Sequence, residues 1–248
     1  DEESGYFGYT MYDKDSSKPY IMKTDDGENW DKGFDGVYPL IAGAVDGERK
    51  KRLIGHIKNP KEMWSAAGVS AVDMSASYYK EDGYWNGNVW MSHQWFVWKT
   101  MLDNGDGDFA FEIANRALEM WKEETDFTYY TYECFGISTR RGGWFHNFGG
   151  LSAPICIWAN AYYKVGTVTT GLDVWTDYQK VTESSADIKF KYNGNSNKYT
   201  VIVTLDDSND YKVLLNGNNH SFKMRNGGAI EITIDGNVKS GEINVLSK

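Results

Sequence analysis

The residues best suited to chemistry gather in one stretch, GYWNGNVWMSHQWFVW, which runs from Gly83 to Trp98. Four of its sixteen residues are tryptophan, and neutral hydrogen-bonding side chains stand between them. A hydrophobic core prefers Leu, Ile and Val, because these side chains bring no polar atoms that need partners. A sugar ring stacks its C–H faces on aromatic rings, while its hydroxyl groups need fixed donors and acceptors. The stretch therefore predicts a carbohydrate-binding surface.

Trp85 and Trp90 are the predicted stacking platforms of this stretch. Trp85 stands next to Asn86 and Gly87 at the start of a predicted helix, and Tyr84 adds a hydroxyl group. The alternative is that all three aromatic rings belong to the hydrophobic core. We favour sugar binding for Trp85, and we count Tyr84, Asn86 and Trp90 with it as candidate substrate-binding residues.

The rest of the stretch divides between core and site. For Trp95 and Trp98 we prefer the core interpretation. The amide of Gln94 could hydrogen-bond a sugar hydroxyl, which makes it a candidate substrate contact. His93 stands beside it, but a histidine satisfied within a core is more common than a functional one.

Glu133 is the carboxyl group best suited to acid–base chemistry. It lies between the tyrosine-rich run 129–132 and the pair Cys134–Phe135. A carboxylate in apolar surroundings without an adjacent cation has a raised pKa, which suits proton transfer. The alternative is a loop glutamate whose side chain turns to solvent.

Three further positions are candidate substrate contacts. Asp35, in GFDGVYPL, is either the cap of the helix that follows or part of a sugar subsite. Arg140 and its neighbour Arg141 could hold an acidic substituent, or they could tie a loop to nearby carboxylates. Trp144 is a further candidate platform, because its flanking glycines let the backbone approach a ligand.

The pattern predicts neither a metal site nor a cofactor. The run Asp103–Asp108 misses the spacing of a calcium-binding EF-hand, since Gly105 stands where a ligand is needed. A turn followed by a helix cap explains the run better. No histidine pair has zinc-site spacing, and the sequence contains neither GxSxG nor a phosphate-binding glycine loop.

Composition narrows the function classes. Of 248 residues, 15% are aromatic, and the formal net charge of −9 includes no long basic block, so nucleic acid is not an expected partner. No apolar run reaches the ~20 residues that span a bilayer, so we expect no membrane partner. Cys134 and Cys156 form either one disulfide or two free thiols. The chain opens without a signal peptide, which leaves secreted, periplasmic and cytoplasmic locations all open.

The pattern of the sequence changes near Tyr178, because all ten tryptophans precede it. The first part has the helical periodicity of a mostly α domain with long loops. Predicted helices cover residues 37–58, a segment capped by Asn59, residues 88–102, residues 108–123 with Asp108 as cap, and residues 152–164. After Tyr178, six short alternating runs separated by Asn-Gly and Asp-Gly turns predict an antiparallel β domain.

Several segments together resemble the (α/α)6-barrel glycoside hydrolases around family 63, which include mannosylglycerate-hydrolase-like enzymes and processing α-glucosidases. These segments are GVYPLIAG (36–43), NPKEMWSAAGVSAVD (59–73), YWNGNVW (84–90), TYECFG (131–136) and WFHNFGGLSAPICIWANAYY (144–163). They follow one another at intervals that fit the family, and the resemblance covers about residues 1–178.

The resemblance implies a fold and a reaction. We expect a mainly α chain, with part of an (α/α)6 toroid over residues 1–178 and a small antiparallel β-sandwich domain over residues 179–248. The implied activity is an inverting, exo-acting hydrolysis of α-linked glucosides or mannosides, with Glu133 as the general base and an oligosaccharide or glycoside as substrate. The family's general acid lies upstream of the matched segments. We therefore expect this chain alone to be catalytically incomplete and to need an N-terminal part of the barrel as its partner.

Two departures keep other functions open. Asn86 replaces an arginine of the family, and the chain supplies about five helices where a full toroid has about twelve. A phosphorylase or sugar epimerase of the same fold is one alternative. A carbohydrate-binding protein or fragment without catalysis is the other.

Overall fold

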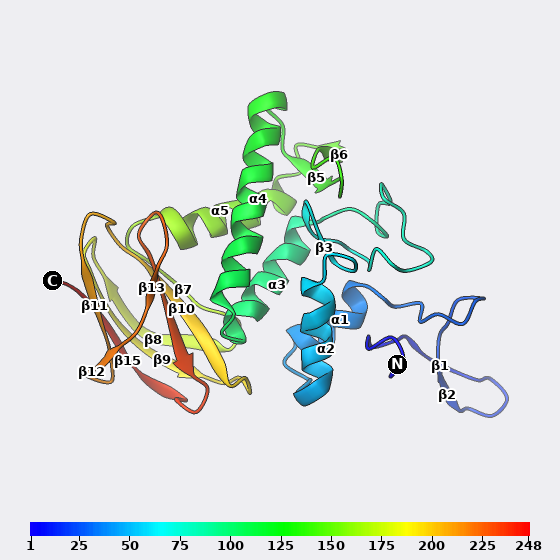
Figure 1. Ribbon diagram of the computed structural model, residues 1–248, viewed down its shortest axis with the longest axis horizontal. Coiled ribbons are helices and arrows are strands. Elements are labelled where there is room, and N and C mark those ends of the chain that lie inside the picture. The colour runs from blue at the N-terminus through cyan, green and yellow to red at the C-terminus, as the bar shows by residue number, and fades with distance from the viewer. The chain divides into compact units, whose positions relative to one another are not determined.

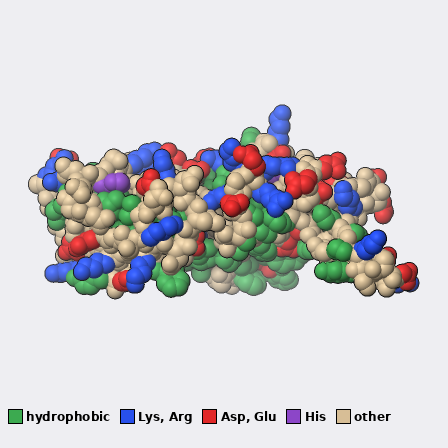
Figure 2. Space-filling model, turned by 90° about the horizontal axis from the view of Figure 1, so that it is seen from below, with side chains coloured by type: hydrophobic (Ala, Val, Ile, Leu, Met, Phe, Trp, Pro, Cys, Tyr) green, Lys and Arg blue, Asp and Glu red, His purple; other side chains and the backbone are tan.

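The computed structural model describes residues 1–248 and contains five α-helices and fifteen β-strands (Figure 1). The chain divides into two compact units. The first combines residues 1–94 with 119–152, and the second combines residues 95–118 with 153–248. None of the helices has the length and apolar character needed to cross a bilayer. On the face seen in Figure 2, acidic and basic side chains are interspersed.

The expectation of a mainly α chain built from part of an (α/α)6 toroid is wrong, because strands are three times as numerous as helices and the fold is mixed α and β. Outside their helices, the first 152 residues form turns, short hairpins and extended loops.

The predicted helix over residues 37–58 is two helices, α1 (Phe34–Ile41) and α2 (Gly47–Lys58). Gly43 and Gly47 have φ angles of 66° and 53°, in the left-handed region that interrupts a right-handed helix. The sequence pattern did not show this break.

The helix predicted to begin at Asn59 is absent. Asn59 ends α2 instead, and its side-chain oxygen accepts the backbone N–H of Lys61 at 3.0 Å in a turn. Glu62 does not close a capping box, because its Oε2 lies 2.7 Å from Nδ1 of His56. The turn leads into the short hairpin of β3 (Trp64–Ser65) and β4 (Gly68–Val69).

The three long helices lie where the sequence placed them, as α3 (Met91–Asp103), α4 (Gly107–Thr128) and α5 (Gly149–Tyr163). One face of α4 is buried, including Ile113 and Met120. Its cap is Asp106 rather than Asp108, since Oδ1 of Asp106 accepts the N–H of Phe109 at 3.2 Å.

The second unit contains two antiparallel sheets whose side chains share one hydrophobic core. The four-stranded sheet has the order β13 (Lys223–Met224), β14 (Ala229–Asp235), β10 (Lys198–Thr204), β7 (Thr167–Thr169). The five-stranded sheet has the order β12 (Asn218–His220), β11 (Tyr211–Leu215), β15 (Ser240–Ser247), β9 (Ser185–Tyr192), β8 (Val174–Val181). Strands β7 and β8 were not predicted.

Two further hairpins complete the first unit. They pair β1 (Thr10–Tyr12) with β2 (Pro19–Ile21), and β5 (Tyr132–Phe135) with β6 (Gly142–His146). Cys134, on β5, and Cys156, on α5, are both free thiols.

Candidate functional site

Glu133 lies at an irregularity in strand β5. The register between β5 and β6 shifts between Tyr132 and Cys134, so Glu133 has no regular cross-strand partner. Irregularities of this kind, such as β-bulges, change the direction of a side chain and are common beside active sites. Here the Glu133 side chain is buried, with 5% of the residue exposed. The alternative of a solvent-facing loop glutamate is therefore wrong.

The two oxygens of the Glu133 carboxylate differ in their surroundings. Oε1 accepts a hydrogen bond from the hydroxyl of Tyr84, and this bond raises the pKa of Tyr84 to about 12. Oε2 is buried and has no hydrogen-bond partner in the protein. A buried carboxylate oxygen without a donor is costly unless water or a ligand supplies one. The free oxygen is thus the natural place for a water molecule or a substrate hydroxyl.

A backbone bridge holds Tyr84 near Glu133. Val89 and Phe135 exchange two backbone hydrogen bonds, each 2.9 Å long, which join the segment after Tyr84 to the end of β5. Trp90 follows directly and donates its Nε1–H to the backbone oxygen of Tyr84 at 3.0 Å. The predicted aromatic stretch and the predicted carboxyl group therefore meet in one place.

Three tryptophans surround the Tyr84 ring edge-on, with ring centroids 5.0 Å away for Trp85, 4.9 Å for Trp90 and 4.7 Å for Trp144. Trp85 also stacks on Trp90 at 4.2 Å with an interplanar angle of 5°. Trp85 and Trp144 are 60% and 58% exposed, whereas Trp90 is 2% exposed. Trp85 and Trp144 hence offer accessible aromatic faces, and Trp90 supports Trp85 from the interior.

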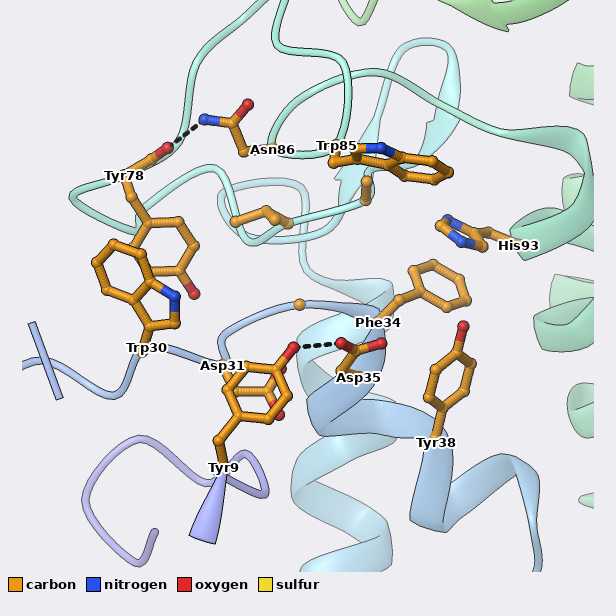
Figure 3. A pocket seen from close by; sticks show the side chains of 13 residues that line it. Tyr9, Trp30, Asp31, Phe34, Asp35, Tyr38, Tyr78, Trp85, Asn86 and His93 are labelled. Atoms are coloured by element: carbon orange, nitrogen blue, oxygen red, sulfur yellow. Dashed lines mark hydrogen bonds between the residues drawn. The ribbon is translucent and has the colours of Figure 1, made fainter. Parts of the chain in front are cut away.

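A cavity of about 570 Å³ adjoins Trp85 (Figure 3). Thirteen residues line it: Tyr9, Trp30, Asp31, Gly33, Phe34, Asp35, Tyr38, Ala71, Val72, Tyr78, Trp85, Asn86 and His93. Glu133 is not one of them. Trp85 borders the cavity and contacts Tyr84, so it links the cavity to the residues around Glu133.

Two carboxyl groups face this cavity. Burial raises the pKa of Asp31 to about 7, and the nearby charge of Asp35 adds to the shift. Asp35 accepts a hydrogen bond from the hydroxyl of Tyr9 (Figure 3). Asp35 is the second residue of α1 and not its cap, because the cap position is Gly33 and no side chain caps the helix.

His93 contributes a neutral ring to the same cavity. Burial lowers its pKa to about 4, and its ring stacks on Phe34 with centroids 4.0 Å apart. Asn86 also lines the cavity, and its amide donates to the backbone oxygen of Tyr78 at 2.7 Å.

Three other residues discussed as substrate contacts bind groups of the protein itself. Gln94 is buried, and its amide accepts from Val69 N at 2.8 Å and donates to Val69 O at 2.7 Å, which fixes β4. Arg140 lies 3.2 Å from Glu123. Its neighbour Arg141 makes two contacts of 2.5 Å and 3.2 Å with the carboxylate of Glu124.

Several cavity residues were missed in the sequence. Tyr9, Trp30, Asp31, Tyr38 and Tyr78 line the cavity but were not singled out. The density of aromatic and acidic residues between positions 30 and 38 was the available signal. Their convergence with Tyr9 and Tyr78 depends on loop conformations that carry no periodic pattern.

A cluster of possible metal ligands was also missed in the sequence. Atoms of His56, Glu62 and Asp73 lie within 4.8 Å of one another. The ammonium group of Lys32 pairs with this cluster, because its Nζ lies 3.9 Å from the carboxylate of Asp73. Tyr6 donates its hydroxyl to Asp73 at 3.0 Å. These contacts describe a network of ion pairs and hydrogen bonds.

Part of the sequence matches a known family of protein domains. Residues 10–143 match the model of the mannosylglycerate hydrolase MGH1-like glycoside hydrolase domain, which is more than half of the chain. The chain belongs to this family of glycoside hydrolase domains.

Individual relatives are distant. A probable mannosyl-oligosaccharide glucosidase of Schizosaccharomyces pombe is 21% identical over 141 residues, which is 50% of this chain and 17% of that protein. The mannosylglycerate hydrolase of Thermus thermophilus in complex with glucose is 23% identical, with 64% of this chain and 34% of that chain covered and a TM-score of 0.46. The neutral trehalase of Saccharomyces cerevisiae is 18% identical, with coverages of 64% and 27% and a TM-score of 0.47. This chain thus spans about a third or less of the length of each relative.

Proposed function

We propose that this chain carries the general base of a glycoside hydrolase, that the base is Glu133, and that the enzyme cleaves α-linked glucosides or mannosides. The observation that carries the proposal is the buried carboxylate of Glu133, whose Oε1 is held by Tyr84 while Oε2 has no partner in the protein. Membership of a glycoside hydrolase family supports the reaction class. The glucosidase named among the relatives supports the choice of substrate.

The proposed mechanism proceeds with inversion of the anomeric carbon. In such enzymes two carboxyl groups stand roughly 6.5–9.5 Å apart, which leaves room for a water molecule beneath the sugar. Glu133 takes a proton from this water through Oε2 while the water oxygen bonds to the anomeric carbon. The glycosidic C–O bond breaks on the opposite face, and the leaving oxygen receives a proton from a general acid. We assign that acid to a part of the enzyme outside this chain.

The tryptophans around Tyr84 suit the substrate side of this mechanism. Trp85 and Trp144 are the two exposed rings of the cluster, and a pyranose can stack its C–H face on either. Trp90 keeps Trp85 in place by stacking on it. We propose that Trp85 and Trp144 position a terminal sugar, which makes the enzyme exo-acting.

The Glu133→Gln variant of the complete protein tests the proposal. The amide keeps the size of the side chain and loses the ability to accept a proton, so we expect turnover of α-glycosides to fall by ~10²–10⁴-fold. Kinetics on a panel of p-nitrophenyl α-glucoside, p-nitrophenyl α-mannoside and disaccharides would measure the loss.

The matched control is Glu112→Gln. Glu112 is a half-exposed glutamate on α4 that pairs with Arg116 across one helical turn. Its replacement should leave turnover within about twofold of wild type, because surface ion pairs of this kind contribute little. Wild-type turnover in a correctly folded Glu133→Gln variant would remove Glu133 from the role of base.

A further inference from the structure

The cavity beside Trp85 is acidic. Asp31 and Asp35 both line it, and none of its thirteen lining residues is Lys or Arg. Most of the remaining wall is aromatic, and Figure 3 shows the two carboxyl groups across the cavity from the Trp85 ring. A volume of about 570 Å³ falls within the range of ~300–1,000 Å³ that is typical of small-ligand sites.

The two carboxyl groups are held in different ways. Asp31 is 7% exposed, and the backbone N–H of Gly36 hydrogen-bonds to its carboxylate. Asp35 is exposed and lies in the first turn of α1, where the helix dipole favours negative charge. The hydroxyl of Tyr9 donates to one oxygen of Asp35. Asp35 therefore presents a fixed negative group at an accessible part of the cavity wall.

The two arginines that the sequence suggested for binding an acidic substituent lie outside this cavity. Arg140 and Arg141 are paired with Glu123 and Glu124, and neither arginine lines the cavity. An acidic substituent would have to compete with those carboxylates for the guanidinium groups. The expectation that these arginines hold an acidic substituent therefore has no support in their contacts.

We propose that this cavity is a subsite for an uncharged hexopyranose unit and that Asp31 and Asp35 exclude sugars that carry a carboxylate. Carboxylate oxygens accept hydrogen bonds from sugar hydroxyls, while the aromatic wall covers the C–H face of the ring. A carboxylate on the ligand would be the third in the cavity and would meet like charge, which disfavours that ligand directly. The inference rests on the proposed function in one respect, namely that the bound sugar belongs to the glycoside substrate.

A matched pair of ligands tests this selectivity. The compounds p-nitrophenyl α-glucoside and p-nitrophenyl α-glucuronide differ only at C6, where a CH2OH group is replaced by a carboxylate. Their dissociation constants are measured by calorimetry with the complete Glu133→Gln protein at about pH 8, so that turnover does not interfere. We expect the glucuronide to bind at least about tenfold more weakly than the glucoside.

Single substitutions assign the effect to the cavity. In the Glu133→Gln background, Asp35→Asn removes one negative charge from the exposed wall, and the ratio of the two dissociation constants should fall to within about threefold. Asp35→Glu keeps the charge and should keep the ratio. Asp25→Asn removes an exposed charge outside the cavity and should leave the ratio unchanged.

Three outcomes would overturn the subsite: equal binding of both ligands, binding of neither, or an unchanged ratio in Asp35→Asn. If Glu133→Gln retains full activity, the assignment of the base fails, and the subsite is then tested by comparing the KM of the glucoside with the inhibition constant of the glucuronide. If the base is supported but both ligands bind equally, the subsite fails alone.

Discussion

Glu133 and Tyr84 form a single unit although 49 positions separate them in the sequence. The register between β5 and β6 shifts at Glu133, whose side chain is buried, and the backbone bridge between Val89 and Phe135 joins the segment after Tyr84 to the end of β5. A base held by a third group keeps its proton-accepting oxygen in a fixed direction, which is the general arrangement of oriented catalytic bases. In our account Tyr84 is a positioning residue.

Replacing Tyr84 with Phe should therefore reduce turnover more than binding. The substitution removes the hydroxyl that hydrogen-bonds Oε1 of Glu133 and keeps the ring that contacts three tryptophans. Hydrogen bonds to charged groups contribute about 1.5–3 kcal/mol, so we expect kcat to fall roughly tenfold or more while KM stays within about threefold. Steady-state kinetics on the best α-glycoside would measure both constants.

Tyr12→Phe is the matched control for that experiment, because Tyr12 is an exposed tyrosine on β1. It should change neither constant. A Tyr84→Phe enzyme with normal kcat, or one in which only KM rises, would contradict the positioning role.

At the same scale, the sequence singled out individual residues but did not show which of them lie in contact. The aromatic and amide content of residues 83–98 pointed to Trp85, and the apolar setting of Glu133 pointed to its carboxyl group. The pairing of Tyr84 with Glu133 could not be read from the sequence, because it depends on the bridge at Val89. Gln94 was a candidate substrate contact, but both ends of its amide hydrogen-bond the backbone of Val69.

At the scale of elements, Asp31 lies just before helix α1, and its carboxyl group has an unusually high pKa. Burial raises the pKa of Asp31 from 3.8 to about 7 in the folded protein. Between these values the unfolded chain has released its proton while the folded protein retains it. The folded state then binds more protons, so the free energy of unfolding decreases as pH rises from about 4 to about 7.

Asp31→Asn should remove this contribution. The amide oxygen can still accept from Gly36, and the side chain no longer ionises. We therefore compare the free energy of unfolding of the variant with that of wild type. The difference, variant minus wild type, should increase by on the order of 2 kcal/mol as the pH rises from about 5 to 8. Urea denaturation at both pH values would measure the change. A constant difference between the two proteins across this range would contradict the assignment.

The sequence predicted the longest helices and the strands with a strong apolar pattern. Helices α3, α4 and α5 are the three longest, and the side chains of strands such as β10 and β14 are almost all buried. Strand β8 was missed because six of its eight residues are exposed, which leaves no apolar alternation to detect. The break between α1 and α2 was missed because it depends on the backbone conformation of two glycines.

At the scale of the whole molecule, family resemblance and fold class proved to be separate questions. The resemblance was right about the family, and the mainly α architecture inferred with it was wrong. Turns and short hairpins fill much of the first unit, because its loops lack the apolar spacing of a helix. The division of the chain into domains at residue 178 remains a prediction.

The central claim for the complete enzyme is that Glu133 activates the attacking water on the face opposite the leaving group. Replacing Glu133 with Ala removes the base and leaves space for a small anion beside the Tyr84 hydroxyl. Azide needs no deprotonation, so it can attack the anomeric carbon directly while p-nitrophenolate departs.

The most direct test is the product formed by complete Glu133→Ala protein from p-nitrophenyl α-glucoside in the presence of azide, followed by proton NMR. If Glu133 is the base, azide restores p-nitrophenol release and the product is the β-configured glucosyl azide. Failure of azide to restore release, or formation of the α-configured azide, would contradict this role.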